Sequence, residues 1–141
     1  MEKVAIVWSG PYSIDSARNR FRGWEDFGIY MITRKWGEKE RIIYIGLVYW
    51  RTFADRIAEH ERDWLWALRG QIRVRVGKIR LKRGKKHSIE RTEDIENLLI
   101  YVYQPEYNEK GKAGYYGREI EIVNLGKRGP LDKIVYFEDY R

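Results

Sequence analysis

The chain has 141 residues, of which 43% are hydrophobic and 15% aromatic, and this size and composition suit one domain around one core. The absence of cysteine excludes disulfide bonds and thiolate metal sites. No apolar run reaches the about 18 residues of a membrane-spanning helix, and the N-terminus lacks a signal-peptide pattern, so we expect a cytoplasmic protein that makes no membrane contact. A charged share of 35% with two methionines is typical of thermophile proteins.

The net charge of +7 is concentrated in one stretch. Between Arg69 and His87 the sequence contains basic residues and no acidic one, and their number exceeds the net charge of the chain. A concentrated basic stretch is typical of a protein that binds a polyanion such as nucleic acid, but basic side chains also protect exposed edge strands from unwanted pairing. Charge alone leaves both alternatives open. The candidate nucleic-acid-binding residues, called the basic strip below, are Arg69, Arg73, Arg75, Lys78, Arg80, Lys82, Arg83, Lys85 and Lys86.

The first predicted strand covers residues 3–8, Lys-Val-Ala-Ile-Val-Trp, and the turn residues of 9–11, Ser-Gly-Pro, end it. The polar, basic segment from there to Phe27 contains a possible helical turn over 15–22. Two β-branched and aromatic runs follow at 28–33 and 42–48, separated by a polar loop that contains glycine. Such a pattern predicts an antiparallel hairpin.

Alternation along the hairpin strands places Tyr30 with Ile32 on one face and Tyr44 with Val48 on one face of the partner strand. The other faces are aliphatic, so we expect both tyrosines to point into one cleft. A helix is predicted next, over residues 53–69.

Thr52 is the predicted N-cap of that helix, and Gly70 is its predicted stop. Arg56 and His60 are four residues apart, so they share a face at or beside the apolar stripe. The sequence therefore predicts a polar pair next to the buried face, at a cleft between helix and sheet.

Residues 72–82 alternate between apolar and basic side chains and predict a strand with a basic face. The phase slips by one residue at Gly77, which is typical of a β-bulge or a tight turn. Two further strands are predicted at 119–123 and 133–137.

A second helix is predicted between the strand at 72–82 and the strand at 119–123. It begins near Ser88 or Thr92 and ends before Pro105, and Glu96 lies on the flank of its apolar stripe. The sequence shows no internal repeat and no domain linker.

Four elements with chemically useful side chains follow one another within residues 28–108. They are Gly28-Ile29-Tyr30, Tyr44-Ile45-Gly46, Arg56 with His60, and Glu96 followed by Pro105 and Asn108. This order resembles the GIY-YIG nuclease family, which is named for the two strand sequences present here unchanged. The restriction-enzyme branch is closest in polar residues, because it pairs an arginine with a histidine one helical turn later. The chain departs from the family at Leu47 and Val48, where many members have a polar or basic residue followed by Thr or Ser.

We accordingly expect an α/β fold with a small central antiparallel β-sheet flanked by helices, plus extra N- and C-terminal strands. The chain would be a single domain, residues 1–141, with a nuclease core at 28–108 and elaborations of unknown role at 1–27 and 109–141. The resemblance implies a divalent-metal-dependent endonuclease that hydrolyses DNA and uses one Mg²⁺ or Mn²⁺ per active site. The predicted catalytic residues are Tyr30, Tyr44, Arg56, His60, Glu96 and Asn108, the last orienting either the exit loop or a catalytic group.

Each of these side chains can be given a role in phosphodiester hydrolysis. The reaction needs an activated water, relief of charge at phosphorus and a stabilised leaving oxygen. Glu96 supplies one hard oxygen ligand for the metal, and Arg56 offers a planar fork for a phosphate. Tyr30 would orient or deprotonate the water with His60 as its base, and Tyr44 would donate a hydrogen bond.

Two other functions are compatible with the same residues. A non-catalytic nucleic-acid-binding module could retain the fold without cleavage, although the complete polar set argues against it. An RNA nuclease could use the same chemistry. One carboxylate implies one metal and one cut strand per active site, so the chain would act as a monomer or a homodimer.

Overall fold

The computed structural model describes residues 1–23 and 26–137, without the side chain of Asp26. Residues 24–25 and 138–141 of the predicted elaborations 1–27 and 109–141 lie outside the described residues. No helix in the described part of the chain has the length and apolar character needed to cross a membrane. The described elements are β1 (Glu2–Tyr12), α1 (Ile14–Arg20), β2 (Asp26–Trp36), β3 (Lys39–Arg51), α2 (Phe53–Asp63), the 3-10 helix η1 (Leu65–Ala67), β4 (Gln71–Arg80), α3 (Ile89–Tyr103), β5 (Ile120–Gly126) and β6 (Ile134–Tyr136).

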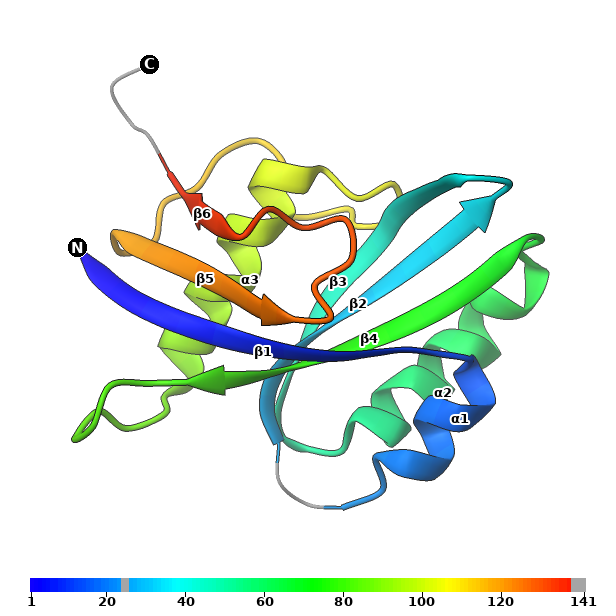
Figure 1. Ribbon diagram of the computed structural model, residues 1–141, viewed down its shortest axis with the longest axis horizontal. Helices are drawn as coiled ribbons and strands as arrows, with labels where there is room; N and C mark the ends of the chain where they lie inside the picture. Colours follow the sequence, from blue (N-terminus) through cyan, green and yellow to red (C-terminus); the bar gives the residue numbers. More distant parts are fainter. Residues whose placement is uncertain (24–25, 138–141) are drawn as a thin grey trace.

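The strands form one curled, mixed sheet of six in the order β3-β2-β4-β1-β5-β6 (Figure 1). Neighbours β1 and β5 are parallel, and every other neighbouring pair in this order is antiparallel. The predicted small central antiparallel sheet flanked by helices is therefore wrong. Strands β2, β3 and β4 do form an antiparallel group, but an open strand edge presents unpaired backbone groups. The edge of β4 binds β1, and β1 binds β5, so the terminal strands continue the same sheet.

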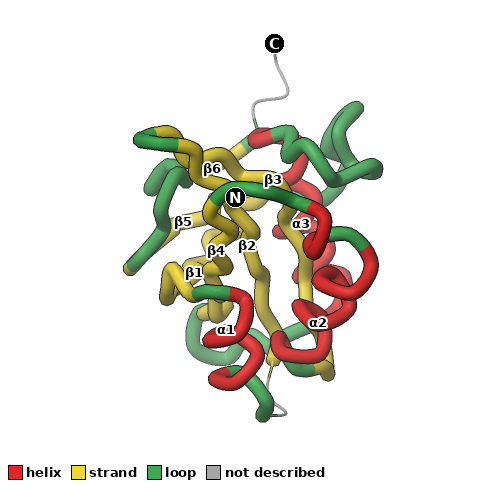
Figure 2. The backbone as a smooth tube through the Cα atoms, turned by 90° about the vertical axis from the view of Figure 1, so that its right-hand side faces the viewer, coloured by secondary structure: helices red, strands yellow, loops and turns green. Residues whose placement is uncertain are grey.

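The side chains of β2 alternate between two cores, as the hairpin pattern predicts. Ile29 and Met31 pack with the buried face of α3, whereas Tyr30 and Ile32 pack with α1 and α2. Helices α1 and α2 lie side by side against that second core (Figure 2). All four of these β2 side chains are fully buried. Helix packing on both faces thus buries the middle of β2 completely.

Helix α2 begins as predicted, since the Thr52 side chain accepts a hydrogen bond from the backbone N–H of Asp55 at 3.0 Å. The helix ends earlier than predicted, because the backbone of Trp64 leaves the helical region at φ −154°. Only the short η1 turn follows. The indole of Trp64 instead lies against the ring of His60, one turn back along the helix.

Helix α3 begins after the N-cap Ser88, the first of the two predicted positions, and ends at Gln104, whose φ is +49°.

The predicted irregularity at Gly77 is wrong, because β4 pairs with β2 through Gly77 without a register shift. A Cβ atom at Gly77 would lie 2.4 Å from Cγ2 of Ile6. The glycine is therefore required by the close approach of β1 and does not mark a bulge.

Candidate active site

A pocket of about 520 Å³ opens between β3, α2, α3 and the segment that follows α3. Its walls include Tyr44 from β3, Arg56 and His60 from α2, Glu96 from α3, and Asn108. Five of the six predicted catalytic residues therefore meet at one cavity although they are spread over 65 positions of sequence. Tyr30, the sixth, is not on the pocket wall.

Tyr30 lies behind the pocket and is fully buried. It is directly opposite Gly46 on β3, and a Cβ atom at Gly46 would lie 2.3 Å from the Tyr30 hydroxyl. The glycine of the Tyr44-Ile45-Gly46 sequence therefore provides the space for the Tyr30 ring. Because the hydroxyl is enclosed, Tyr30 is placed to act on other side chains and not on a water in the open pocket.

A chain of hydrogen bonds leads from Trp64 to Tyr44, and we call it the donor chain. Nε1 of Trp64 donates to Nδ1 of His60 at 2.8 Å. An indole nitrogen can only donate, so Nδ1 of His60 is unprotonated and its neutral ring carries the proton on Nε2. Nε2 lies 2.6 Å from the Tyr30 hydroxyl oxygen and donates a hydrogen bond to it. The Tyr30 hydroxyl in turn donates to the oxygen of Tyr44, which also accepts from Arg56.

The protonation states agree with this direction. Burial, and after it the positive charge of Arg56, lower the pKa of His60 to about 4. His60 is thus neutral at pH 7, with one ring proton. In this geometry His60 is a donor to Tyr30, so the predicted role of a base that deprotonates Tyr30 does not fit.

The two phenols of the donor chain differ in how easily they can ionise. Burial raises the pKa of Tyr30 well above its usual range, and the neighbouring Tyr44 raises it further. Burial also raises the pKa of Tyr44, but the charge of Arg56 and the hydrogen bonds from Tyr30 and Arg56 act against this. The pKa of Tyr44 stays raised, but by less than that of Tyr30, so Tyr44 is the phenol that ionises more readily, and it is the one on the pocket wall.

Glu96 is the carboxylate of the site. Burial, and after it the charge of Glu93, raise the pKa of Glu96 to about 7. The charge of Arg56 and a hydrogen bond from the backbone N–H of Leu47 oppose this rise. A carboxylate left short of positive charge in this way fits a hard divalent cation. The described residues contain no group of three His, Asp or Glu that could hold a metal. A magnesium ion here would therefore have Glu96 as its protein ligand, with water and phosphate oxygens completing the shell.

Asn108 holds the wall of the pocket in place. Its amide nitrogen donates to the carbonyl of Ile45, its amide oxygen accepts from the N–H of Ile45, and both distances are 2.9 Å. The N–H of Tyr107 donates to the carbonyl of Ile43 at 2.8 Å. Since β3 is an edge strand, these bonds satisfy part of its open edge. Of the two predicted roles for Asn108, orienting the exit loop is the one that its contacts support.

Arg56 is positioned by an acidic residue that the sequence analysis missed. Its Nη1 atom lies 2.7 Å from Oε1 of Glu59, and Glu59 also pairs with Arg51. Trp64 was missed as well, although it follows His60 by four residues, which is the spacing that brings two helical side chains together. Its ring stacks on Tyr107 with centroids 4.9 Å apart.

The basic strip does not form one face. Arg75 is buried and pairs with Glu40, and Lys78 lies 6.0 Å from the centre of the Phe53 ring. Within the described residues, no member of the strip is on the wall of the pocket. The members exposed to solvent are Arg69, Lys78, Arg80, Lys82, Arg83, Lys85 and Lys86, and Arg73 is half-buried.

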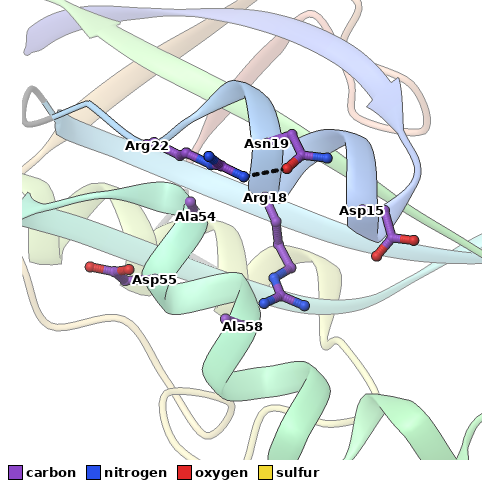
Figure 3. A pocket seen from close by; sticks show the side chains of 7 residues that line it. All are labelled: Asp15, Arg18, Asn19, Arg22, Ala54, Asp55 and Ala58. Atoms are coloured by element: carbon purple, nitrogen blue, oxygen red, sulfur yellow. Dashed lines mark hydrogen bonds between the residues drawn. The ribbon is translucent and has the colours of Figure 1, made fainter.

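A second hollow, of about 600 Å³, lies between α1 and α2 (Figure 3). Its polar side chains are engaged with each other or with α2, since Arg18 pairs with Glu61 at 3.0 Å and Arg22 donates to Asn19. Asp15 and Asp55 lie at its margins (Figure 3). It contains no histidine or tyrosine beside a carboxylate, so we place no chemistry there.

No known protein family, curated protein or solved structure matches this chain. The likeness to GIY-YIG nucleases therefore rests on the two strand sequences and on the order of the polar residues. The assignment of chemistry to the pocket rests on its own geometry.

Proposed function

We propose that this chain is a divalent-metal-dependent endonuclease of the GIY-YIG type that hydrolyses DNA, one strand per active site. The observation that carries the proposal is the meeting of a phenol, a guanidinium and a carboxylate from three different elements at one cavity. At this cavity Tyr44 can orient a water, Arg56 can bind a phosphate, and Glu96 can bind a metal. These are the three needs of phosphodiester hydrolysis.

In this mechanism Tyr44 orients the attacking water and, when ionised, takes its proton. The hydrogen bonds from Tyr30 and Arg56 stabilise the negative oxygen of Tyr44. The water oxygen forms a bond to phosphorus, the bond from phosphorus to the leaving oxygen breaks, and that oxygen takes up a proton from a solvent water in the open pocket. The rate should therefore rise with pH until Tyr44 is ionised.

Arg56 binds the phosphate in this scheme. Its planar guanidinium suits two phosphate oxygens, and Glu59 holds it beside Tyr44. Glu96 would hold the metal. A bound Mg²⁺ or Mn²⁺ would supply positive charge for the phosphate and the leaving oxygen.

DNA is the proposed partner because the exposed residues of the basic strip supply positive charge outside the pocket. A cytoplasmic location and a monomeric or homodimeric state belong to the same proposal. With one carboxylate per chain, a double-strand break needs two copies of the site, so a monomer should leave a nick.

The test is nicking of supercoiled plasmid with and without Mg²⁺, for the wild type, Glu96→Gln and Glu93→Gln. Glu93 is on the same helix but exposed, so it is the matched control for loss of one negative charge. We expect Mg²⁺-dependent nicking that Glu96→Gln abolishes and Glu93→Gln retains. DNA binding without nicking would leave a non-catalytic binding module, and cleavage of matched RNA alone would make the chain an RNA nuclease. Nicking by Glu96→Gln within tenfold of the wild type would remove Glu96 from the mechanism.

A further inference from the structure

Four aromatic rings gather at the end of the β2–β3 hairpin far from its turn. Phe27 stands at the centre, with its ring centroid 4.8 Å from Tyr49, 4.8 Å from Trp50 and 4.7 Å from His87. The His87 ring is stacked on Phe27 at an angle of 13°. We call these four residues the aromatic surface. It is separate from the pocket, whose wall includes none of them.

Trp50 is the exposed member of this surface, and its backbone is held in an unfavourable conformation. The side chain is 63% exposed, and its φ is +59°, in the left-handed region that bulky residues avoid. Phe27 pairs with Tyr49 and Asp26 with Arg51, which leaves Trp50 as the extra residue of a β-bulge. The bulge turns an indole into solvent at a cost in backbone strain. Such strain is often found where a residue serves binding and not packing.

The aromatic surface borders a run of positive charge. His87 follows directly after a segment, called the basic loop, that contains the exposed residues Lys82, Arg83, Lys85 and Lys86. None of these four forms an ion pair with another residue of the described chain. Burial lowers the pKa of His87, and Arg91 lowers it further, so the ring itself is a neutral stacking group at pH 7. Exposed aromatic rings beside unpaired cations are what binds the bases and phosphates of an unpaired strand.

Two features connect this surface to the proposed active site. Glu59 pairs with Arg51, the residue after Trp50, and with Arg56 at the pocket. Strand β3 runs directly from Tyr44 to Trp50, and six residues of strand span about 20 Å. At 3.4 Å per nucleotide of a helical strand, that is about six nucleotides.

We propose that the aromatic surface and the basic loop bind an unpaired stretch of DNA, with a base stacked on Trp50, about six nucleotides from the phosphate in the pocket. This inference rests on the DNA partner of the proposed function and adds to it a preference for DNA with unpaired bases. The basic loop would hold the phosphates of that stretch, and Trp50 would recognise the presence of a base without reading its identity.

The test uses two labelled DNA strands of about 12 nucleotides, one of thymidines and one of abasic sites with the same number of phosphates. Fluorescence anisotropy without divalent metal measures binding of each strand to the wild type, Trp50→Asn and Trp66→Ala. Asparagine tolerates the left-handed region, so Trp50→Asn removes the ring without new strain. Trp66 is 73% exposed and lies outside the aromatic surface, which makes it the matched control.

We expect the wild type to prefer the thymidine strand by roughly 5- to 150-fold, the value of one stacked base. Trp50→Asn should lose this preference while unfolding at the same temperature as the wild type or a higher one, and Trp66→Ala should keep it. Replacing Arg83, Lys85 and Lys86 by glutamine should weaken both strands alike and flatten the salt slope by about 2. Equal affinity of the wild type for the two strands, or no binding of either, would overturn the inference. Plasmid nicking is measured separately. Nicking without a preference for the thymidine strand would refute the stacking site alone, and that preference without nicking would refute the nuclease activity alone.

Discussion

Replacing Trp64 by phenylalanine tests the direction of the donor chain. The substitution keeps a ring against Tyr44 and Tyr107 but removes the hydrogen bond that Nδ1 of His60 accepts from the indole. The imidazole proton can then move to Nδ1, which turns Nε2 into an acceptor. The Tyr30 hydroxyl would donate to His60, and Tyr44 would lose one of the two hydrogen bonds that support its ionised form.

The size of the effect follows from the value of that bond. A net hydrogen bond contributes about 0.5–1.5 kcal/mol, so the apparent pKa of the rate should rise by about 0.4 to 1. At any pH below that pKa the variant should be slower by roughly 2- to 13-fold, because a smaller fraction of Tyr44 is ionised. Because the pKa of Tyr44 stays above its usual range, the variant should be slower by a similar factor across the assay range. An unfolding temperature equal to that of the wild type separates this effect from misfolding.

Single-turnover nicking of one duplex, measured from about pH 6 to 10, gives the two profiles. The chain has two histidines, so nitrogen NMR shifts identify the protonated ring atom of His60 independently of activity. We expect Nε2–H in the wild type and a larger share of Nδ1–H in Trp64→Phe. Wild-type His60 protonated on Nδ1, or equal rates for the two proteins across this pH range, would refute the reasoning. His87 in the same spectra is the internal control.

Three further outcomes are expected. Tyr44→Phe should slow nicking by roughly 10²–10⁴-fold at neutral pH and Tyr30→Phe by less, the reverse of the order expected from sequence; equal losses in single-turnover assays would contradict this. Without metal, Glu96→Gln should be more stable than the wild type at pH 8 by on the order of 2 kcal/mol in urea unfolding. Folding raises the pKa of the Glu96 carboxyl from about 4.5 to about 7, so its ionisation destabilises the wild type increasingly as pH rises through this range. The gain should shrink at pH 4 and when Mg²⁺ is added to both proteins. Arg75→Gln should lower the free energy of unfolding by about 1.5–3 kcal/mol and leave the salt dependence of DNA binding unchanged, whereas Arg80→Gln should lower the salt slope by about 0.9 without loss of stability.

The sequence predicts which residues share a face of the hairpin, but not how deeply each of them is buried. Alternation places Tyr30 and Tyr44 on one side of the sheet, and the structure agrees. Alternation does not say which tyrosine is enclosed, since this depends on how α2 packs and on the missing side chain at Gly46. The predicted division of labour between the two phenols therefore does not fit the geometry, although both residues were correctly grouped.

Long-range pairing accounts for the other differences. The strand at 3–8 was expected, but its parallel pairing with β5, more than a hundred residues away, leaves no local pattern in either segment. The same limit applies to Arg75, which alternation assigned to a basic face. Its partner Glu40 follows the hairpin turn on β3, and β2 lies between the two strands in the sheet. Short-range periodicity predicts an element and its faces, whereas the order of strands and the pairing of charges depend on the assembled sheet.

Groups that lower the stability of the fold help to distinguish structural from functional positions in this chain. Where a charge serves only the fold, a partner within the chain accompanies it, as Glu40 does for the buried Arg75. Glu96 forms no ion pair within the described residues, and the charge of Arg56 with the backbone N–H of Leu47 still leaves its pKa at about 7. Trp50 keeps a left-handed backbone that costs roughly 1–2 kcal/mol and exposes an indole to water. A cost that the chain itself offsets only in part is expected where a molecule outside it offsets the rest, and for these two residues a metal ion and an unpaired base have the required chemistry.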